Sequence, residues 1–163
     1  DHPLADIQLN NLHANIAIVT EDGYLLDEKI AGNIAYGTMR CANEAKITTA
    51  AHASHAMEFI RHMPDGLQTQ IGKEGTTINQ QQFRQLAIAR ALVKNAPILI
   101  LDEIPTAQEE SNSGNLLSAL EKLIQNRTTL IFNQYIPQLK KVDRIIVLEN
   151  GCITESLKGP NNS

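Results

Sequence analysis

The chain has 163 residues, of which 42% are hydrophobic and 20% charged, the balance of about one globular domain and not of a disordered chain. Its net charge of −4, without a basic run, argues against a nucleic-acid-binding protein. No apolar stretch is long enough to cross a bilayer and no signal peptide stands at the start, so we expect the chain neither to span a membrane nor to enter a secretory route on its own. Cys41 and Cys152 form no CxxC pair, which favours a reduced cytoplasmic setting over a disulfide framework.

The front half of the chain combines one strand pattern with a long helical stretch. The continuous apolar run at residues 15–19 (NIAIV) predicts a strand covered on both faces. Residues 27–82 contain no convincing strand and predict a helical insert or subdomain. Within it, residues 44–63 are rich in alanine and predict one helix, with apolar residues at helical spacing: Ala50, Ala53, Met57 and Ile60.

The back half of the chain alternates helix and strand patterns. Residues 83–94 and 115–125 predict amphipathic helices, while the apolar runs at residues 98–101, 129–132 and 144–148 predict strands. Asn150-Gly151 predicts a hairpin turn from the last of these strands into residues 152–154. This order predicts an α/β fold with a mainly parallel sheet flanked by helices.

Two adjacent carboxylates end the apolar strand of residues 98–103 (ILILDE). In open α/β sheets the carboxyl ends of the strands line the ligand crevice. Asp102 there could hold Mg²⁺ through water, and Glu103 could orient or deprotonate an attacking water. This pattern is typical of a Walker B strand followed by a catalytic Glu, and an ordinary strand ending in an acidic turn is the alternative.

The surroundings of this strand resemble a known family. The pentad at residues 78–82 (INQQQ) is followed by a helix ending in AIARAL, then by one turn, and then by the run PILILDE. In this order they resemble the ATP-binding domain of ABC transporters, where the pentad is the LSGGQ signature. The resemblance covers residues 1–158 and is closest to exporters of the bacterial lipid A type. Residues 26–37 resemble the segment that meets a transmembrane partner.

The resemblance implies a fold, an activity and a set of partners. The fold is part of a P-loop NTPase-like domain, with a helical subdomain at about 27–92, an α/β core at 1–26 and 93–158, and a disordered tail at 159–163. The activity is ATP hydrolysis that powers export of a lipid or drug-like substrate, with ATP and Mg²⁺ as cofactors. The partners are a transmembrane domain and a second ATP-binding domain in a head-to-tail dimer, at the cytoplasmic face of a membrane.

The same resemblance assigns roles to particular residues. Asp102 would bind Mg²⁺, and Glu103 would polarise the water that attacks the γ-phosphate. Glu21 stands at the position of the Q-loop Gln, and Gln134 at that of the switch His. The signature pentad would face the nucleotide of the second domain, through Asn79, Gln80, Gln81 and Gln82.

The chain also departs from the family pattern. The phosphate loop GxxxxGK[ST] does not occur in the 163 residues, and in the family it would precede Asp1. Gln80 and Gln81 put long side chains where the signature has glycines that let the backbone approach a phosphate. Asn79 replaces the signature Ser but can still cap a helix, and only Gln82 matches.

These departures keep a second hypothesis open. Glu21 adds a negative charge near the expected phosphates, and Gln134 cannot carry a positive charge. The alternative is therefore a degenerate, non-catalytic ABC-derived domain that acts only through a partner, or a gene remnant. Without the front part of the family's domain, we expect sheet edges and apolar faces to be uncovered and the isolated chain to be marginally stable or self-associating.

A weaker candidate site lies in the helical stretch. His52 and His55 stand three positions apart on one predicted helix, and His62 follows. A His-x-x-His pair could bind a metal ion, whereas a solvated helix face is the alternative.

Overall fold

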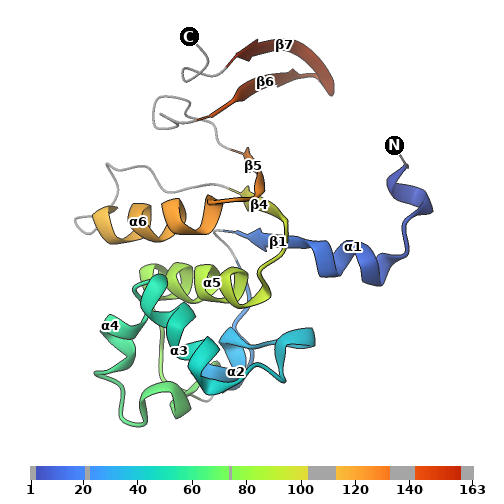
Figure 1. The fold of residues 1–163 in the computed structure, drawn as a ribbon. Coiled ribbons are helices and arrows are strands. Elements are labelled where there is room, and N and C mark those ends of the chain that lie inside the picture. Colours follow the sequence, from blue (N-terminus) through green and yellow to red (C-terminus); the bar gives the residue numbers. More distant parts are fainter. Residues whose placement is uncertain (1–2, 21–22, 74, 103–112, 133–141, 159–163) are drawn as a thin grey trace. The chain divides into compact units, whose positions relative to one another are not determined.

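The computed structural model describes residues 3–20, 23–73, 75–102, 113–132 and 142–158. The chain divides into two compact units, Asp1–Phe132 and Asn133–Ser163, and each is described here by itself (Figure 1). In the described part of the first unit the elements, in chain order, are η1 (Leu4–Asp6), α1 (Leu9–Asn15), β1 (Ile16–Val19), β2 (Glu28–Lys29), α2 (Ile30–Ile34), η2 (Gly37–Met39), α3 (Glu44–Ala53), α4 (Met57–Ile60), η3 (Gly66–Gln68), β3 (Gln70–Ile71), α5 (Gln80–Lys94), β4 (Ile98–Asp102), α6 (Ser113–Ile124) and β5 (Thr128–Phe132).

A parallel sheet with the strand order β1-β4-β5 forms the centre of the first unit. In its register Ile18 is opposite Ile100, which is opposite Leu130. The predicted strands at 98–101 and 129–132 and the mainly parallel sheet are confirmed. The first strand begins one residue later than predicted, because Asn15 is the last residue of α1, a helix that the sequence analysis did not predict.

One face of this sheet is covered by helices α5 and α6. Ala17, Leu99 and Leu101 are buried there, together with side chains of both helices: Ile88, Ala91, Leu116, Ala119, Leu120 and Leu123. Each step from β1 to β4 to β5 moves in the same direction across the sheet. Right-handed crossovers in one direction place their helices on the same face, which explains the one-sided packing.

The opposite face of the sheet carries apolar side chains that stay exposed. Ile18 is 58% exposed, Leu130 48% and Phe132 49%. The sequence prediction that these strands are covered on both faces is therefore wrong as far as the described elements are concerned. A continuous apolar run indicates that both faces of a strand are apolar, but it does not predict which elements cover each face.

Helix α5 lies between the sheet and a layer made of α2, α3 and α4 (Figure 1). The face of α5 that is turned toward this layer contributes Leu86, Ala89 and Val93 to a second apolar cluster. The other members of that cluster come from the helical layer and β3: Ile30, Ile34, Ala35, Ile47, Ala50, Ala51, Ala56, Ile60 and Ile71. One long helix thus belongs to both cores and ties the helical layer to the sheet.

The predicted helix over residues 44–63 is broken in the structure. Helix α3 ends at Ala53, and α4 begins only at Met57. Between them the buried Ser54 donates its hydroxyl to the Ala51 carbonyl oxygen at 3.2 Å, and His55 adopts φ +61°. A serine that bonds to the preceding turn, followed by a left-handed residue, ends a helix despite apolar side chains that keep helical spacing.

A short antiparallel ladder also lies where the sequence predicted no strand. Glu28 of β2 pairs with Ile71 of β3, and Lys29 pairs with Gln70. Strands of two residues leave no periodicity in the sequence, so only the tertiary structure reveals them.

The described part of the second unit is a hairpin of β6 (Arg144–Glu149) and β7 (Cys152–Lys158). Asn150 and Gly151 have φ of +52° and +79°, the positive values that a type I′ turn requires. The predicted hairpin is confirmed, and β7 runs beyond residue 154. The predicted tail at 159–163 lies outside the described residues.

No helix in the described parts of the chain has both the length and the apolar character of a membrane span.

Candidate functional site

Asp102 is the last residue of β4, and its side chain is exposed. It stands opposite Phe132, the last residue of β5, while β1 ends at Val19 opposite Leu101. Because the strands are parallel, their carboxyl ends meet at one edge of the sheet, and Asp102 lies at that edge. The carboxylate is therefore free of core packing and available to a ligand.

The other acidic and polar candidates follow the same strand ends in the sequence. Glu103 comes directly after β4, Glu21 two residues after β1, and Gln134 two residues after β5. All three lie outside the described residues, so their roles stay predictions. The strands that precede them end at the same edge as Asp102.

The signature-like pentad forms the start of α5. Asn79 is the N-cap: its Oδ1 accepts a hydrogen bond from the Gln82 backbone N–H at 2.8 Å. In return, the Gln82 Oε1 accepts from the Asn79 backbone N–H at 3.0 Å. This reciprocal pair is a capping box, which fixes where the helix begins. Asn79 and Gln80 are exposed, whereas Gln81 and Gln82 are half-buried.

The start of α5 and the end of β4 lie on the same side of the first unit. Asn95–Pro97 are the only residues between the two elements, and Asn95 ends α5 in the left-handed conformation, φ +53°. The chain therefore reverses, and Ile88 of α5 packs in one cluster with Leu99 and Leu101 of β4. This arrangement places the capping box of α5 toward the edge of the sheet that carries Asp102.

Asp102 suits a divalent cation, whereas two of the backbone N–H groups at the start of α5 are already bonded. An exposed carboxylate at a strand end suits Mg²⁺, which keeps several waters and takes one or two protein carboxylates. A phosphate at a helix start needs backbone N–H groups, and those of Asn79 and Gln82 already bond within the capping box. Across the described ranges, His, Cys, Asp and Glu form no group of three or more that could hold a metal ion.

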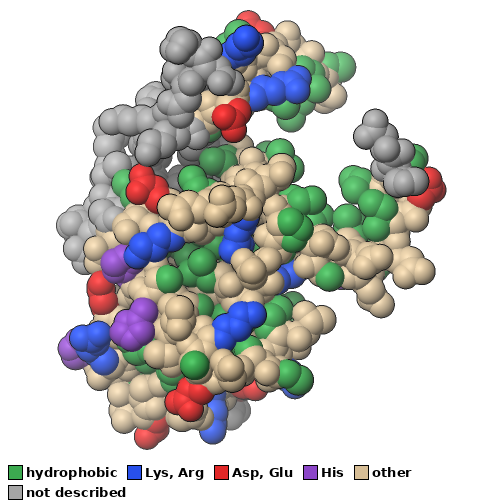
Figure 2. Space-filling model, in the orientation of Figure 1, with side chains coloured by type: hydrophobic (Ala, Val, Ile, Leu, Met, Phe, Trp, Pro, Cys, Tyr) green, Lys and Arg blue, Asp and Glu red, His purple; other side chains and the backbone are tan. Residues whose placement is uncertain are grey.

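The histidines have other contacts. The ring Nδ1 of His55 lies 2.8 Å from Glu58 Oε1, and that of His62 lies 2.8 Å from the Glu58 carbonyl oxygen. Figure 2 shows histidine side chains gathered on one part of the surface, close to charged side chains. Since α3 ends before His55, His52 and His55 do not share the continuous helix face on which the metal-pair hypothesis depended.

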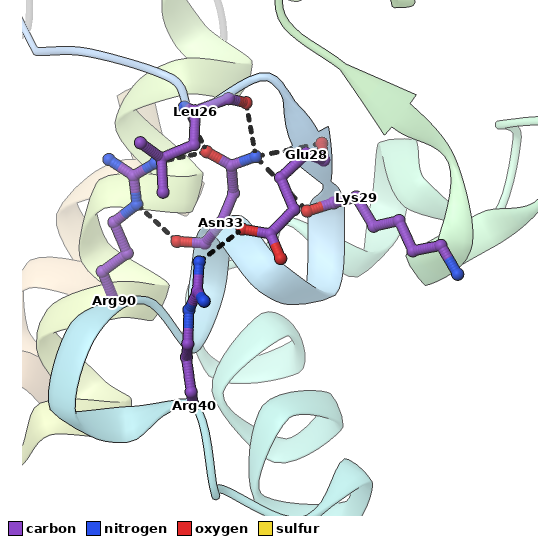
Figure 3. A network of polar contacts seen from close by, with 6 residues as sticks. All are labelled: Leu26, Glu28, Lys29, Asn33, Arg40 and Arg90. Carbon is purple, nitrogen blue, oxygen red and sulfur yellow. Dashed lines mark hydrogen bonds and ion pairs between the residues drawn. The ribbon is translucent and has the colours of Figure 1, made fainter.

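The sequence analysis missed a buried polar network. Asn33 of α2 has no exposed surface and bonds to Arg90 of α5, which is 57 positions away (Figure 3). The only sequence signal is an amide within the apolar run of α2 and an arginine on the mainly apolar α5. No local motif connects two residues at such a distance.

Comparison with known proteins agrees with this geometry. Residues 1–107 match the family model described as ABC transporter. The chain is 44% identical to the proteins named ATP-dependent lipid A-core flippase from Thiobacillus denitrificans and Chromobacterium violaceum, over 94% of this chain and 26% of each relative. A solved structure titled "Structure of a bacterial Atm1-family ABC exporter with ATP bound" matches with a TM-score of 0.83 and 31% identity, over 97% of this chain and 27% of that one. This chain thus spans about a quarter of the length of these relatives, and it belongs to the ABC transporter family.

Proposed function

We propose that this chain is a portion of the ATP-binding, ATP-hydrolysing domain of an ABC exporter that moves a lipid or drug-like substrate across a membrane. The observation that carries the proposal is the exposed Asp102 at the carboxyl edge of a parallel sheet, within a fold that matches an exporter over 97% of the chain. The names of the relatives, a lipid A-core flippase that depends on ATP and an exporter with ATP bound, support the nucleotide and the lipid class.

In this proposal the chain's own residues position a metal and a water. Asp102 would hold Mg²⁺, and a bound Mg²⁺ would supply positive charge that stabilises the phosphates during transfer. Glu103, the next residue, accepts a proton from the attacking water. The capping box holds Asn79 and Gln82 at the start of α5, where the pentad faces a nucleotide held by a second domain.

The proposal also assigns partners. Residues 26–37 contact a transmembrane domain, and a second ATP-binding domain completes the site in a head-to-tail dimer. The chain then works at the cytoplasmic face of a membrane. Its relatives are flippases and an exporter about four times its length, which supports the presence of such further parts.

A specific observation favours a second candidate, a non-catalytic ABC-derived domain. The Asn79 and Gln82 backbone N–H groups bond to side chains of the same turn, so a phosphate must displace those bonds to reach them. Gln80 and Gln81 also occupy positions where the family's signature has glycine. In this second candidate the domain contributes contacts to a partner but does not hydrolyse ATP.

A chimera distinguishes the two candidates. Residues 1–158 replace the matching segment of the flippase from Thiobacillus denitrificans, which supplies the rest of the exporter. If the chain is catalytic, the chimera hydrolyses Mg-ATP, and Asp102→Asn lowers the rate by about 100-fold. The matched control is Asp65→Asn, which removes the same charge from an exposed carboxylate directly before η3 and leaves the rate unchanged.

Two results of the chimera experiment would contradict catalysis. One is an assembled chimera that hydrolyses ATP no faster than its own Asp102→Asn variant. The other is hydrolysis that Asp102→Asn and Asp65→Asn lower equally. Either result, together with a folded chimera by circular dichroism, leaves the non-catalytic candidate.

A further inference from the structure

The side chain of Asn33 is the centre of a polar network inside an apolar layer (Figure 3). It is fully buried on α2, between Ile30 and Ile34, which are themselves fully buried. Its Oδ1 accepts from the Leu26 backbone N–H at 2.9 Å, and its Nδ2 donates to the carbonyl oxygens of Leu26 at 3.0 Å and Glu28 at 3.2 Å. The oxygen and the nitrogen of one side-chain amide thus both bind the backbone just before α2.

Arg90 joins this network from α5. Its Nε donates to the Asn33 carbonyl oxygen at 2.6 Å, its Nη2 to Asn33 Oδ1 at 2.7 Å, and its Nη1 to the Tyr24 carbonyl oxygen at 3.0 Å. The guanidinium also lies 5.9 Å from the centroid of the Tyr36 ring. Burial lowers the pKa of Arg90 below its usual value, and the neighbouring Tyr36 offsets only part of that decrease. The fork of the guanidinium therefore binds both ends of the segment from Tyr24 to Tyr36.

The network orders a segment that has little regular structure of its own. Apart from the two-residue strand β2 and the short helix α2, residues 23–36 form no helix or strand. Before α2, the Glu28 backbone N–H also donates to the Leu26 carbonyl oxygen at 2.8 Å. A buried polar network with its partners in place favours one arrangement over its alternatives, because any other arrangement leaves buried polar groups unpaired.

The segment presents aromatic side chains at its two ends. Tyr24 is 91% exposed and Tyr36 50% exposed. Arg90 contacts the backbone carbonyl of Tyr24 and the ring of Tyr36. Exposed aromatic rings on an ordered backbone are suited to anchor a partner, since they supply contact area at a small cost in side-chain entropy.

We propose that Arg90 and Asn33 are positioning residues that hold residues 24–36, with their exposed tyrosines, in the arrangement required for partner contact. They also tie this segment to α5, whose first turn carries the Asn79–Gln82 capping box, so that α5 and the partner-facing segment move together. The inference rests on the proposed function, which assigns residues 26–37 to contact with a transmembrane domain.

Amide hydrogen exchange on the full 163-residue chain tests the positioning role without nucleotide or partner. Arg90→Gln removes the fork and is expected to speed exchange of the Leu26 amide at least tenfold, although that amide bonds to Asn33 and not to Arg90. Arg90→Lys keeps the charge but replaces the planar fork with a point charge, so it should not restore slow exchange. Amides of β4 and β5 should keep their rates within twofold.

The matched control is Arg40→Gln. Arg40 belongs to the same region and pairs with Glu28 at 3.5 Å, but its side chain is 67% exposed. It should leave the Leu26 exchange rate unchanged. The proposal is overturned if Arg90→Gln leaves that rate within twofold, or if it speeds exchange equally in α5, β4 and β5, the result expected of a residue that only stabilises the whole unit.

The flippase chimera tests the partner part of the proposal. There, Arg90→Gln should lower the lipid-stimulated part of ATP hydrolysis at least fivefold and leave the KM for ATP within twofold, while Arg40→Gln changes neither. Equal losses of basal and stimulated hydrolysis would overturn it. If the parent chimera hydrolyses no ATP, the proposed catalytic function fails, and the exchange experiment alone decides the positioning role.

Discussion

The capping box at the start of α5 makes a quantitative prediction. Asn79→Ala removes the 2.8 Å bond to the Gln82 N–H. The backbone N–H of residue 79, which donates to Gln82 Oε1, is then held less firmly. Asn79 is exposed and Gln82 half-buried, so each bond contributes near the lower end of the usual range of about 0.5–1.5 kcal/mol. We expect Asn79→Ala to lower the free energy of unfolding by about 1 kcal/mol, a typical value for the loss of a helix N-cap.

Related substitutions separate the two bonds. Gln82→Ala removes only the returning bond and should cost about 0.5 kcal/mol. Asn79→Ser keeps a capping oxygen and should stay within a few tenths of a kcal/mol of the parent. The double variant Asn79→Ala with Gln82→Ala should lose less than the sum of the single losses, because either change alone already weakens the shared turn.

Urea unfolding followed by circular dichroism measures these differences, and amide exchange locates them. The matched control is Asn43→Ala, which removes a similar cap from α3, where Asn43 Oδ1 accepts from the Lys46 N–H at 2.9 Å. Both alanine variants should lower stability by a similar amount, but only Asn79→Ala should speed exchange of the Gln82 amide. The reasoning is refuted if Asn43→Ala lowers the unfolding midpoint and Asn79→Ala leaves both the midpoint and that amide unchanged.

Other parts of the structure give further predictions. Leu99→Ala, in the core under α5 and α6, should lower the free energy of unfolding by about 2–5 kcal/mol, while Leu130→Ala, 48% exposed on the open face, should cost less than about 1 kcal/mol in the same urea titration. Arg127→Gln, which loses the 3.0 Å bond to Asn95 Oδ1 at the end of α5, should cost about 1 kcal/mol by thermal unfolding. Gly151→Ala, at φ +79°, should destabilise the β6–β7 hairpin by about 1–2 kcal/mol, seen as faster amide exchange in β6 and β7 with unchanged rates in β4.

Local sequence signals predicted the elements that depend on a few neighbouring residues. The run ILILD became β4, Asn150-Gly151 became the turn of a hairpin, and Asn79 became the N-cap of α5. The position of Asp102 at the edge of a parallel sheet also followed from the order of strand and helix patterns. For the strand, the turn and the cap, the determining interaction spans only a few positions along the chain.

The same reasoning failed where apolar periodicity alone did not decide the structure. Helical spacing continued through residues 44–63, but the buried Ser54 and the left-handed His55 divide that stretch into two helices. The apolar runs of β1, β4 and β5 did not reveal that α5 and α6 both pack on the same face of the sheet. The His52–His55 pair lost its common helix face for the same reason as the long helix.

The amino-acid sequence by itself determined the strand and helix types, the parallel α/β order and the acidic strand end of this ABC transporter chain, because backbone propensity and apolar periodicity are local properties. Only the tertiary structure decided that Arg90 binds Asn33 across 57 positions and that one face of the sheet keeps Ile18 and Phe132 exposed. Those outcomes depend on which surfaces meet when the chain packs. Pairings of that kind leave no periodic trace in the order of the residues.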